Sequence, residues 1–154
     1  MSEKIREIRQ ADMSELKKVV DSSELFPSEY LDEMISDYFN NSDTEEIWFT
    51  YIDNNMPSAI GYCVPEKLTD GTFNLLAIGV LKELQGKGIA NEMMNYIEQY
   101  LKQKGGRILI VETSSDDAQI AARKFYQKIG YIQEAVIRDF WKDGEDKIVF
   151  WKRL

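Results

Sequence analysis

The chain has 154 residues, 44% hydrophobic and 30% charged, which suits one globular domain, residues 1–154, around one core. No apolar run approaches the ~20 residues of a membrane span, and the lack of any histidine excludes Ser-His-Asp catalysis, Cys-His catalysis and histidine-based metal sites. The net charge of −8 favours cationic partners, and the chain has no basic block of the kind that binds nucleic acids. Together with the missing apolar run and the missing histidines, this leads us to expect no nucleic acid, membrane or metal partner.

The first forty residues predict one strand and two helices. The stretch "KIREIRQAD" is typical of a short strand that ends near Ala11. Asp12 is a candidate cap for the first helix, and Ser28, after a break at Pro27, is a candidate cap for the second. The second helix carries apolar residues at helical spacing: Leu31, Met34, Ile35, Tyr38 and Phe39.

The rest of the chain predicts six strands and two helices. The strands are "EIWFTYID", "SAIGYCVPEK", "FNLLAIGV", "RILIVET", "YIQEAVIRDFW" and "KIVFWKRL", and the turn "KDGED" joins the last two as a hairpin. One helix starts near Gly88 and stops at Gly105 and Gly106. The other helix, "AQIAARKFYQKIG", stops at Gly130.

The resulting order of elements is β-α-α-β-β-β-α-β-α-β-β. The β-α-β unit makes the strands near residues 73–80 and 107–113 parallel, and their apolar runs place them at the centre of the sheet. We therefore expect an α/β (α+β) fold with a mixed, mostly antiparallel sheet and helices on both faces.

Two glycines, Gly86 and Gly88, lie between the strand that ends at Val80 and the helix that follows. Glycine lets a bulky pyrophosphate approach the positive end of a helix without meeting a Cβ atom. A plain glycine turn explains these residues equally well. The P-loop and dinucleotide-binding patterns do not fit, because Lys87 is followed by Gly88 and Asn91 stands where a third glycine is required.

Two segments resemble signatures of the GNAT acetyltransferase superfamily. "QGKGIA", from Gln85 to Ala90, is similar to the pattern Q/R-x-x-G-x-G/A. "AARKFYQKIGY" is similar to the pattern A-x-x-F-Y-x-K-x-G-F/Y, with Tyr126 as its tyrosine. The spacing of the two segments and the order of elements along the whole chain also match, so the chain is identified as a member of this superfamily.

The resemblance implies that acetyl-CoA is the acyl donor, used as a co-substrate without a metal. Backbone groups of Ile78 and Val80 would pair with its pantetheine arm, in a slot where the central strand splays from the next parallel strand. Gln119 stands roughly where many relatives carry a cofactor-binding asparagine. The pyrophosphate would lie against the backbone amides of Gln85, Gly86, Lys87, Gly88, Ile89 and Ala90.

Direct attack of a primary amine on the thioester in a ternary complex needs a base, because the neutral form of a lysine-like amine costs roughly 4–5 kcal/mol to reach at pH 7. Glu112 is the first candidate for the base and Glu66 the second. The central strand lacks the glutamate that many relatives carry there, and Asn74 cannot act as a base. The resemblance assigns the thiolate hydrogen bond to Tyr126, and the amide of Val80 is the candidate donor to the carbonyl oxygen.

In the family, acceptors enter between the segment joining the first two helices and the final hairpin. Those segments, "DSSELFPSEY" and "RDFWKDGEDK", are rich in acidic residues. Glu24 and Glu145 would attract a cationic amine of a small molecule or peptide, and Phe26 and Trp141 would form an apolar wall and a cation–π surface. Solvated turn residues are the alternative interpretation.

Two functions besides an N-acetyltransferase stay open. One is a catalytically silent acyl-CoA-binding or regulatory module on the same fold, and the other is an unrelated α/β nucleotide-binding protein. A homodimer is among the partners considered. The single cysteine, Cys63, excludes an internal disulfide, favours a cytoplasmic protein and reads as a small buried residue rather than a nucleophile.

Overall fold

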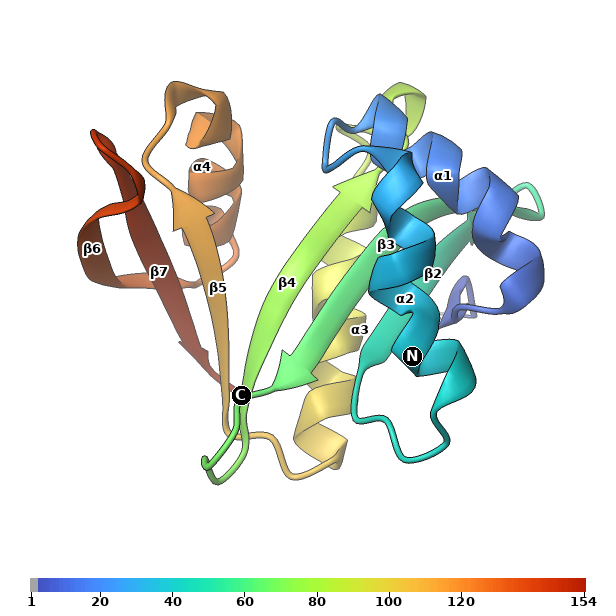
Figure 1. Ribbon diagram of the computed structural model, residues 1–154, viewed down its shortest axis with the longest axis horizontal. Helices are drawn as coiled ribbons and strands as arrows, with labels where there is room; N and C mark the ends of the chain where they lie inside the picture. The colour runs from blue at the N-terminus through green and yellow to red at the C-terminus, as the bar shows by residue number, and fades with distance from the viewer. Residues whose placement is uncertain (1–2) are drawn as a thin grey trace.

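The computed structural model describes residues 3–154, whose strands form a seven-stranded sheet in the order β1-β2-β3-β4-β5-β7-β6 (Figure 1). The strands are β1 (Ile5–Glu7), β2 (Ile47–Asp53), β3 (Met56–Pro65), β4 (Thr72–Val80), β5 (Ile108–Ser114), β6 (Ile132–Lys142) and β7 (Glu145–Arg153). The α-helices are α1 (Met13–Ser22), α2 (Leu31–Asn40), α3 (Ile89–Gln103) and α4 (Ile120–Lys128). Short 3-10 helices cover residues 10–12, 28–30, 82–84 and 117–119.

The predicted order of strands and α-helices is confirmed, and so is the mixed sheet. β4 and β5 pair in parallel, and the other neighbouring strands pair antiparallel. β4 is the central strand, as its almost wholly apolar sequence predicted.

Helices cover both faces of the sheet. Trp48 and Phe49 are neighbours on β2 and therefore point to opposite faces. Phe49 packs in the main core cluster with α3, α4 and the central strands, whereas Trp48 packs in a second cluster with α1 and α2. Figure 1 shows α1 and α2 in front of β2 and β3, with α3 behind them.

The first strand and two helix starts differ from the prediction. β1 ends at Glu7 rather than near Ala11. The Asp12 carboxylate does not cap α1, because it binds the Arg6 guanidinium through two hydrogen bonds of 2.7 and 2.9 Å. Ser28 does not cap α2, because its hydroxyl binds Asp21 and a 3-10 turn precedes the helix.

β4 and β5 separate halfway along their length. The parallel pairing runs from Thr72 opposite Ile108 to Leu75 opposite Val111, while β4 continues to Val80. Leu76 is an extra residue in the pairing of β4 with β3, which is a β-bulge at the point of separation. Figure 1 shows the two strands starting together and diverging toward their carboxyl ends.

Gly79 lets a loop lie close to the backbone of β4. A Cβ atom at Gly79 would lie 2.9 Å from the Ser23 hydroxyl oxygen and 3.1 Å from a methyl group of Leu25. The glycine therefore lets the segment after α1 lie directly against the end of β4.

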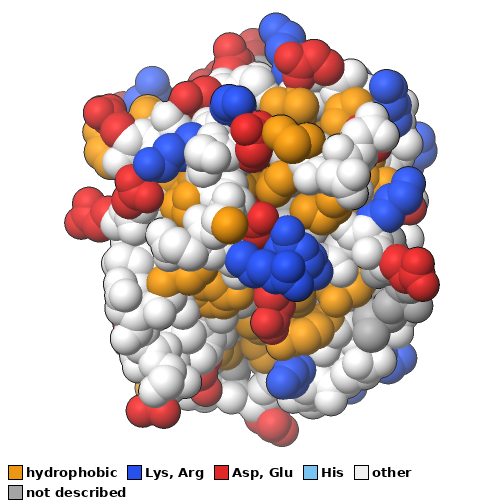
Figure 2. Space-filling model, turned by 90° about the vertical axis from the view of Figure 1, so that its right-hand side faces the viewer, with side chains coloured by type: hydrophobic (Ala, Val, Ile, Leu, Met, Phe, Trp, Pro, Cys, Tyr) orange, Lys and Arg blue, Asp and Glu red, His pale blue; other side chains and the backbone are white. Residues whose placement is uncertain are grey.

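The edge strand β6 is exposed along its whole length. It carries large apolar side chains that are between 46% and 56% exposed: Ile132, Val136, Ile137, Phe140 and Trp141. On the side of the molecule where α1 and α2 lie, Figure 2 shows acidic and basic side chains interspersed with apolar ones. In residues 3–154, no helix has the length and apolar character needed to cross a membrane.

Candidate active site

Two adjoining pockets open where β4 leaves β5. The larger, about 850 Å³, lies over the loop from Gln85 to Gly88 and the start of α3, and we call it the glycine-loop pocket. The smaller, about 460 Å³, lies between the diverging ends of β4 and β5, and we call it the slot. The two pockets share lining residues: Val80, Gln85, Gly86, Ala90 and Phe125. A long ligand can therefore occupy both.

The glycine loop ends at the N-terminus of a 15-residue helix. Gly86 and Gly88 have φ angles of 79° and 85°, in the left-handed region that favours glycine. A Cβ atom at either position would meet no atom within 4 Å, so the loop faces open space. The first amides of α3 have no acceptor within the helix, and the helix dipole is positive there. The loop thus combines the backbone of a glycine turn with the chemistry of an anion site.

Gln85 ties the loop to the end of the central strand. Its side-chain amide donates a 3.0 Å hydrogen bond to the carbonyl oxygen of Val80. Ile89 and Ala90 continue from the loop into α3, and both line the glycine-loop pocket. Lys87 is exposed and lines neither pocket.

The slot brings together the three predicted catalytic residues from three elements. Val80 comes from the end of β4, Glu112 from β5 and Tyr126 from α4. Ile78 lines the slot from β4, and Gln119 lines it from the start of α4. No strand pairs with the β5-facing edge of β4 beyond Leu75 among residues 3–154, so this edge borders the slot.

Tyr126 combines a buried ring with an unengaged hydroxyl. The residue is 6% exposed, and its ring packs against Tyr131 and Phe150. Within residues 3–154, no group forms a hydrogen bond with the Tyr126 hydroxyl. Burial raises the pKa of the Tyr126 phenol well above its usual range, because the phenolate would lose solvation. The phenol is therefore a neutral hydrogen-bond donor at physiological pH.

Glu112 is held from two sides. Its Oε1 accepts a 2.6 Å hydrogen bond from Nδ2 of Asn74, and its Oε2 forms an ion pair with the Lys147 ammonium. Nδ2 of Asn74 also donates a 2.9 Å hydrogen bond to Oε1 of Glu66. The two carboxylates that the sequence offered as alternative bases thus belong to one network.

The sequence analysis missed polar residues of the glycine-loop pocket. Asn91 and Asn95, one turn apart on α3, line it, as does Lys128 at the end of α4. The helical spacing of the two asparagines is visible in the sequence. Lys128 carried no such signal, because only the packing of α4 beside α3 brings it to the pocket.

The predicted acceptor residues lie around the slot rather than in its lining. Ser23 and Leu25 line the slot, whereas their neighbours Glu24 and Phe26 do not. Glu24 is exposed, and Phe26 is partly buried against the second core cluster.

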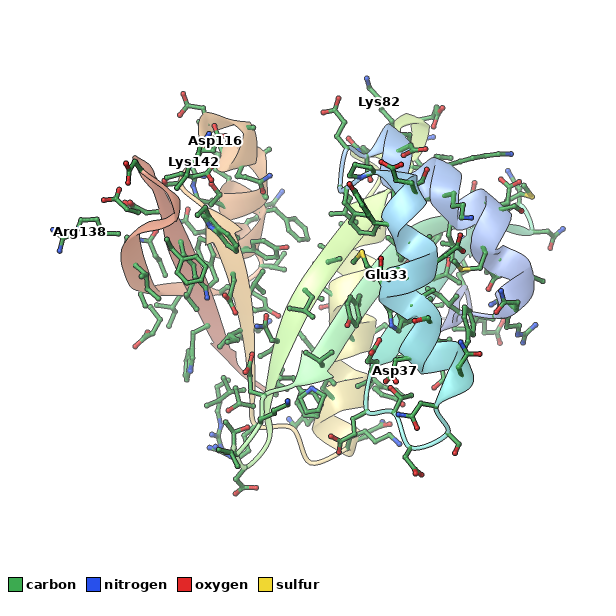
Figure 3. The ribbon with its side chains drawn as sticks, in the orientation of Figure 1. Glu33, Asp37, Lys82, Asp116, Arg138 and Lys142 are labelled. Carbon is green, nitrogen blue, oxygen red and sulfur yellow. The ribbon has the colours of Figure 1, made fainter. Side chains whose placement is uncertain are left out.

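The final hairpin approaches the slot from the β5 side. The indole of Trp141 donates a 3.2 Å hydrogen bond to the carbonyl oxygen of Thr113, which lines the slot. Glu145 faces Lys142 across the hairpin. Figure 3 shows the diverging ends of β4 and β5, with Lys142 and Asp116 on the β5 side and Lys82 on the β4 side. Arg138 points outward, away from β4.

Cys63 is fully buried, as predicted. Burial raises the pKa of its thiol to about 12, so the thiolate is not formed at physiological pH.

A family model matches most of this sequence, and two curated proteins match about half of it. The acetyltransferase (GNAT) family model matches residues 3–131. An N-acetyltransferase of Methanocaldococcus jannaschii is 26% identical over 84 residues, which cover 54% of this chain and 53% of that protein. The chain is thus matched over about half the length of the curated relatives.

Solved structures share the whole fold. A GNAT-family protein from Desulfovibrio desulfuricans has a TM-score of 0.90 and 23% identity over 97% of both chains. An aminoglycoside 6'-N-acetyltransferase in complex with coenzyme A has a TM-score of 0.79 and 17% identity over 97% of this chain and 96% of that chain. Since the family model spans most of the sequence, the chain belongs to the acetyltransferase (GNAT) family.

Proposed function

We propose that the protein is an N-acetyltransferase that moves an acetyl group from acetyl-CoA to a primary amine by direct attack in a ternary complex. The observation that carries this proposal is the meeting of Val80, Glu112 and Tyr126 in one slot that continues into the glycine-loop pocket. Family membership and the coenzyme A complex of a structural neighbour support acetyl-CoA as the donor.

The two pockets suit the two halves of the cofactor. The pyrophosphate lies against the amides of the glycine loop, where open space and the positive end of α3 favour an anion. The pantetheine arm runs along Ile78 and Val80, because the β5-facing edge of β4 carries backbone groups that need partners. The thioester then reaches the slot between Glu112 and Tyr126.

Each catalytic residue has one function in the transfer. Glu112 takes the proton from the acceptor ammonium, directly or through water. The neutral amine attacks the thioester carbon, and the Val80 amide donates to the developing oxyanion. The carbon–sulfur bond breaks, and Tyr126 donates a hydrogen bond to the leaving thiolate. Because burial raises the phenol pKa, a shared proton suits this group better than complete transfer.

A silent acyl-CoA-binding module remains the alternative, because the central strand lacks a glutamate. Its pockets would bind acetyl-CoA, but no acceptor would release the thiol. Acceptor-dependent thiol release, measured with a broad panel of amines and peptides, separates the two functions.

The acceptor in this proposal is a cationic amine of a small molecule or a peptide. The structural neighbour that acts on aminoglycosides, which are polyamines, is compatible with this class. Glu24 and Glu145 attract the acceptor, and Trp141 contacts its apolar part, whereas Phe26 packs with α1 and α2. The cytoplasmic location and the homodimer stay predictions. The exposed apolar side chains of β6 are the surface we expect a dimer to bury, which sedimentation at micromolar concentration would measure.

Gly88→Glu should abolish the cofactor site. The new carboxylate would stand in the space that the first amides of α3 face, and like charges across an interface are strongly unfavourable. We expect acetyl-CoA affinity, measured by calorimetry, to fall by at least about 100-fold. Gly105→Glu is the matched control, because Gly105 also has a positive φ and open surroundings but lies at the other end of α3. Equal losses in both variants would contradict the assignment.

Tyr126→Phe should lower turnover by about 10- to 100-fold and leave acetyl-CoA affinity almost unchanged, as expected for loss of one transition-state donor. Since the phenol stays neutral, the loss should be similar between about pH 6 and pH 9. Tyr96→Phe is the control, because Tyr96 belongs to α3, its ring packs against Phe49 and it lines neither pocket. Wild-type turnover of Tyr126→Phe at saturating substrates would exclude this function of the phenol.

Glu112→Gln should slow transfer at neutral pH, because the variant keeps the shape of the side chain and removes the base. Most of the rate should return only as the pH approaches the acceptor's own pKa, about 10.4 for a lysine-like amine. The exposed Glu45, in the loop before β2, serves as the control through Glu45→Gln. An unaltered pH–rate profile of Glu112→Gln would move the base to Glu66 or to a water chain.

The KM for a cationic acceptor should rise with salt, because exposed charges are screened beyond about 8 Å at physiological ionic strength. The double variant Glu24→Gln, Glu145→Gln should raise the acceptor KM more than it lowers kcat. Its KM should also respond less to salt than that of the wild type. An anionic or hydroxyl compound as the best acceptor in an unbiased screen would disprove the cationic class and leave acetyl transfer standing.

A further inference from the structure

Asn74 joins two carboxylates, one directly after β3 and one on β5, from its place on the central strand. On the central strand, Asn74 lies opposite Val64 of β3 and Ile110 of β5. Glu112 follows Ile110 by two residues on β5, so it points to the same face of the sheet. Glu66 follows Val64 by two residues, directly after β3, and its backbone N–H still bonds the Thr72 carbonyl oxygen of β4. The three polar side chains therefore form a diagonal row with the amide of Asn74 in its middle.

The orientation of this amide follows from the charges around it. A side-chain amide has two N–H groups, and Asn74 directs its nitrogen at Glu66 and at Glu112. The reverse orientation would set the Asn74 carbonyl oxygen against two carboxylates. As it is, no group among residues 3–154 forms a hydrogen bond with that oxygen, and the residue is only 3% exposed. A buried polar group left unsatisfied is costly in a native protein, so the contact with the carboxylates needs an explanation beyond filling space.

We propose that Asn74 is a positioning residue that orients the Glu112 carboxylate toward the slot. This inference rests on the proposed acetyl transfer. Asn74 holds one oxygen of Glu112 and Lys147 holds the other, so the carboxylate plane is fixed by two donors. A carboxylate oxygen accepts more than one hydrogen bond, and Glu112 can therefore still receive the acceptor's proton.

The same network compensates for the missing acid of the central strand. Asn74 cannot act as a base, but its side-chain amide orients Glu112, the proposed base on β5. The same amide nitrogen also bonds the Glu66 carboxylate. Glu66 lines neither pocket, whereas Glu112 lines the slot. Glu112 is therefore the carboxylate that meets the acceptor, and Glu66 sets the orientation of the amide.

Asn74→Ala removes both donors, and Asn74→Leu removes them while keeping about the same side-chain volume and adding no charge. We expect kcat to fall by about 10- to 100-fold in each variant, which is the size of a lost hydrogen bond to a charged group, with acetyl-CoA affinity unchanged within about twofold. Asn41→Ala is the matched control, because Asn41 also bonds a carboxylate, that of Asp37, outside both pockets. Circular dichroism during thermal unfolding identifies any variant that fails to fold.

A double-mutant cycle distinguishes positioning from a general effect on the fold. If Asn74 acts through Glu112, Asn74→Ala should change the rate by less than about twofold in the Glu112→Gln background. A full additional loss in that background would overturn the inference. Wild-type rates in Glu112→Gln would also overturn it, while leaving acetyl transfer by the wild type intact.

A crystal structure of Asn74→Ala tests the same inference without an assay. We expect an unchanged backbone with the Glu112 carboxylate turned or spread over several orientations. An unmoved, well-ordered Glu112 carboxylate would refute the inference whatever the reaction proves to be. Failure of the wild type to transfer acetyl to any amine would instead refute the proposed function.

Discussion

The separation of β4 from β5 is the constraint on which the rest of the site depends. The parallel ladder ends at Leu75 and Val111, and β4 continues for five more residues. Among residues 3–154, no strand pairs with the β5-facing edge of that stretch, and in the proposed function the pantetheine arm supplies its partners. The β-bulge at Leu76 and the close approach of loop and backbone at Gly79 hold the strand in this position.

Tyr126 and Glu112 line the same slot but have different surroundings. Tyr126 sits in an aromatic cluster where burial favours its neutral form. Glu112 sits among donors that stabilise a carboxylate. A buried phenol and a hydrogen-bonded carboxyl group thus line one slot, and the proposed amine acyl transfer uses both.

Local sequence patterns were sufficient to locate most of the strands and helices. Apolar runs located β4 and β5, helical spacing located α2 and α3, and glycines marked the ends of α3 and α4. The predicted caps at Asp12 and Ser28 were wrong because each side chain has a partner outside its own helix start, Arg6 for one and Asp21 for the other. A capping propensity describes local options, and a tertiary partner of higher charge overrides it.

By itself, the sequence determined the order of elements, the glycine loop before α3 and the residues Glu112 and Tyr126 as candidates, because these follow from periodicity and from short motifs. Only the tertiary structure decided where the strands part, which side chains line the slot and that Glu66, Asn74 and Glu112 share one network. Asn74 lies on β4, Glu112 on β5 and Glu66 directly after β3, up to 46 positions apart in the numbering. Their contact depends on the register of β3, β4 and β5, and no local pattern specifies the register between strands so distant in sequence.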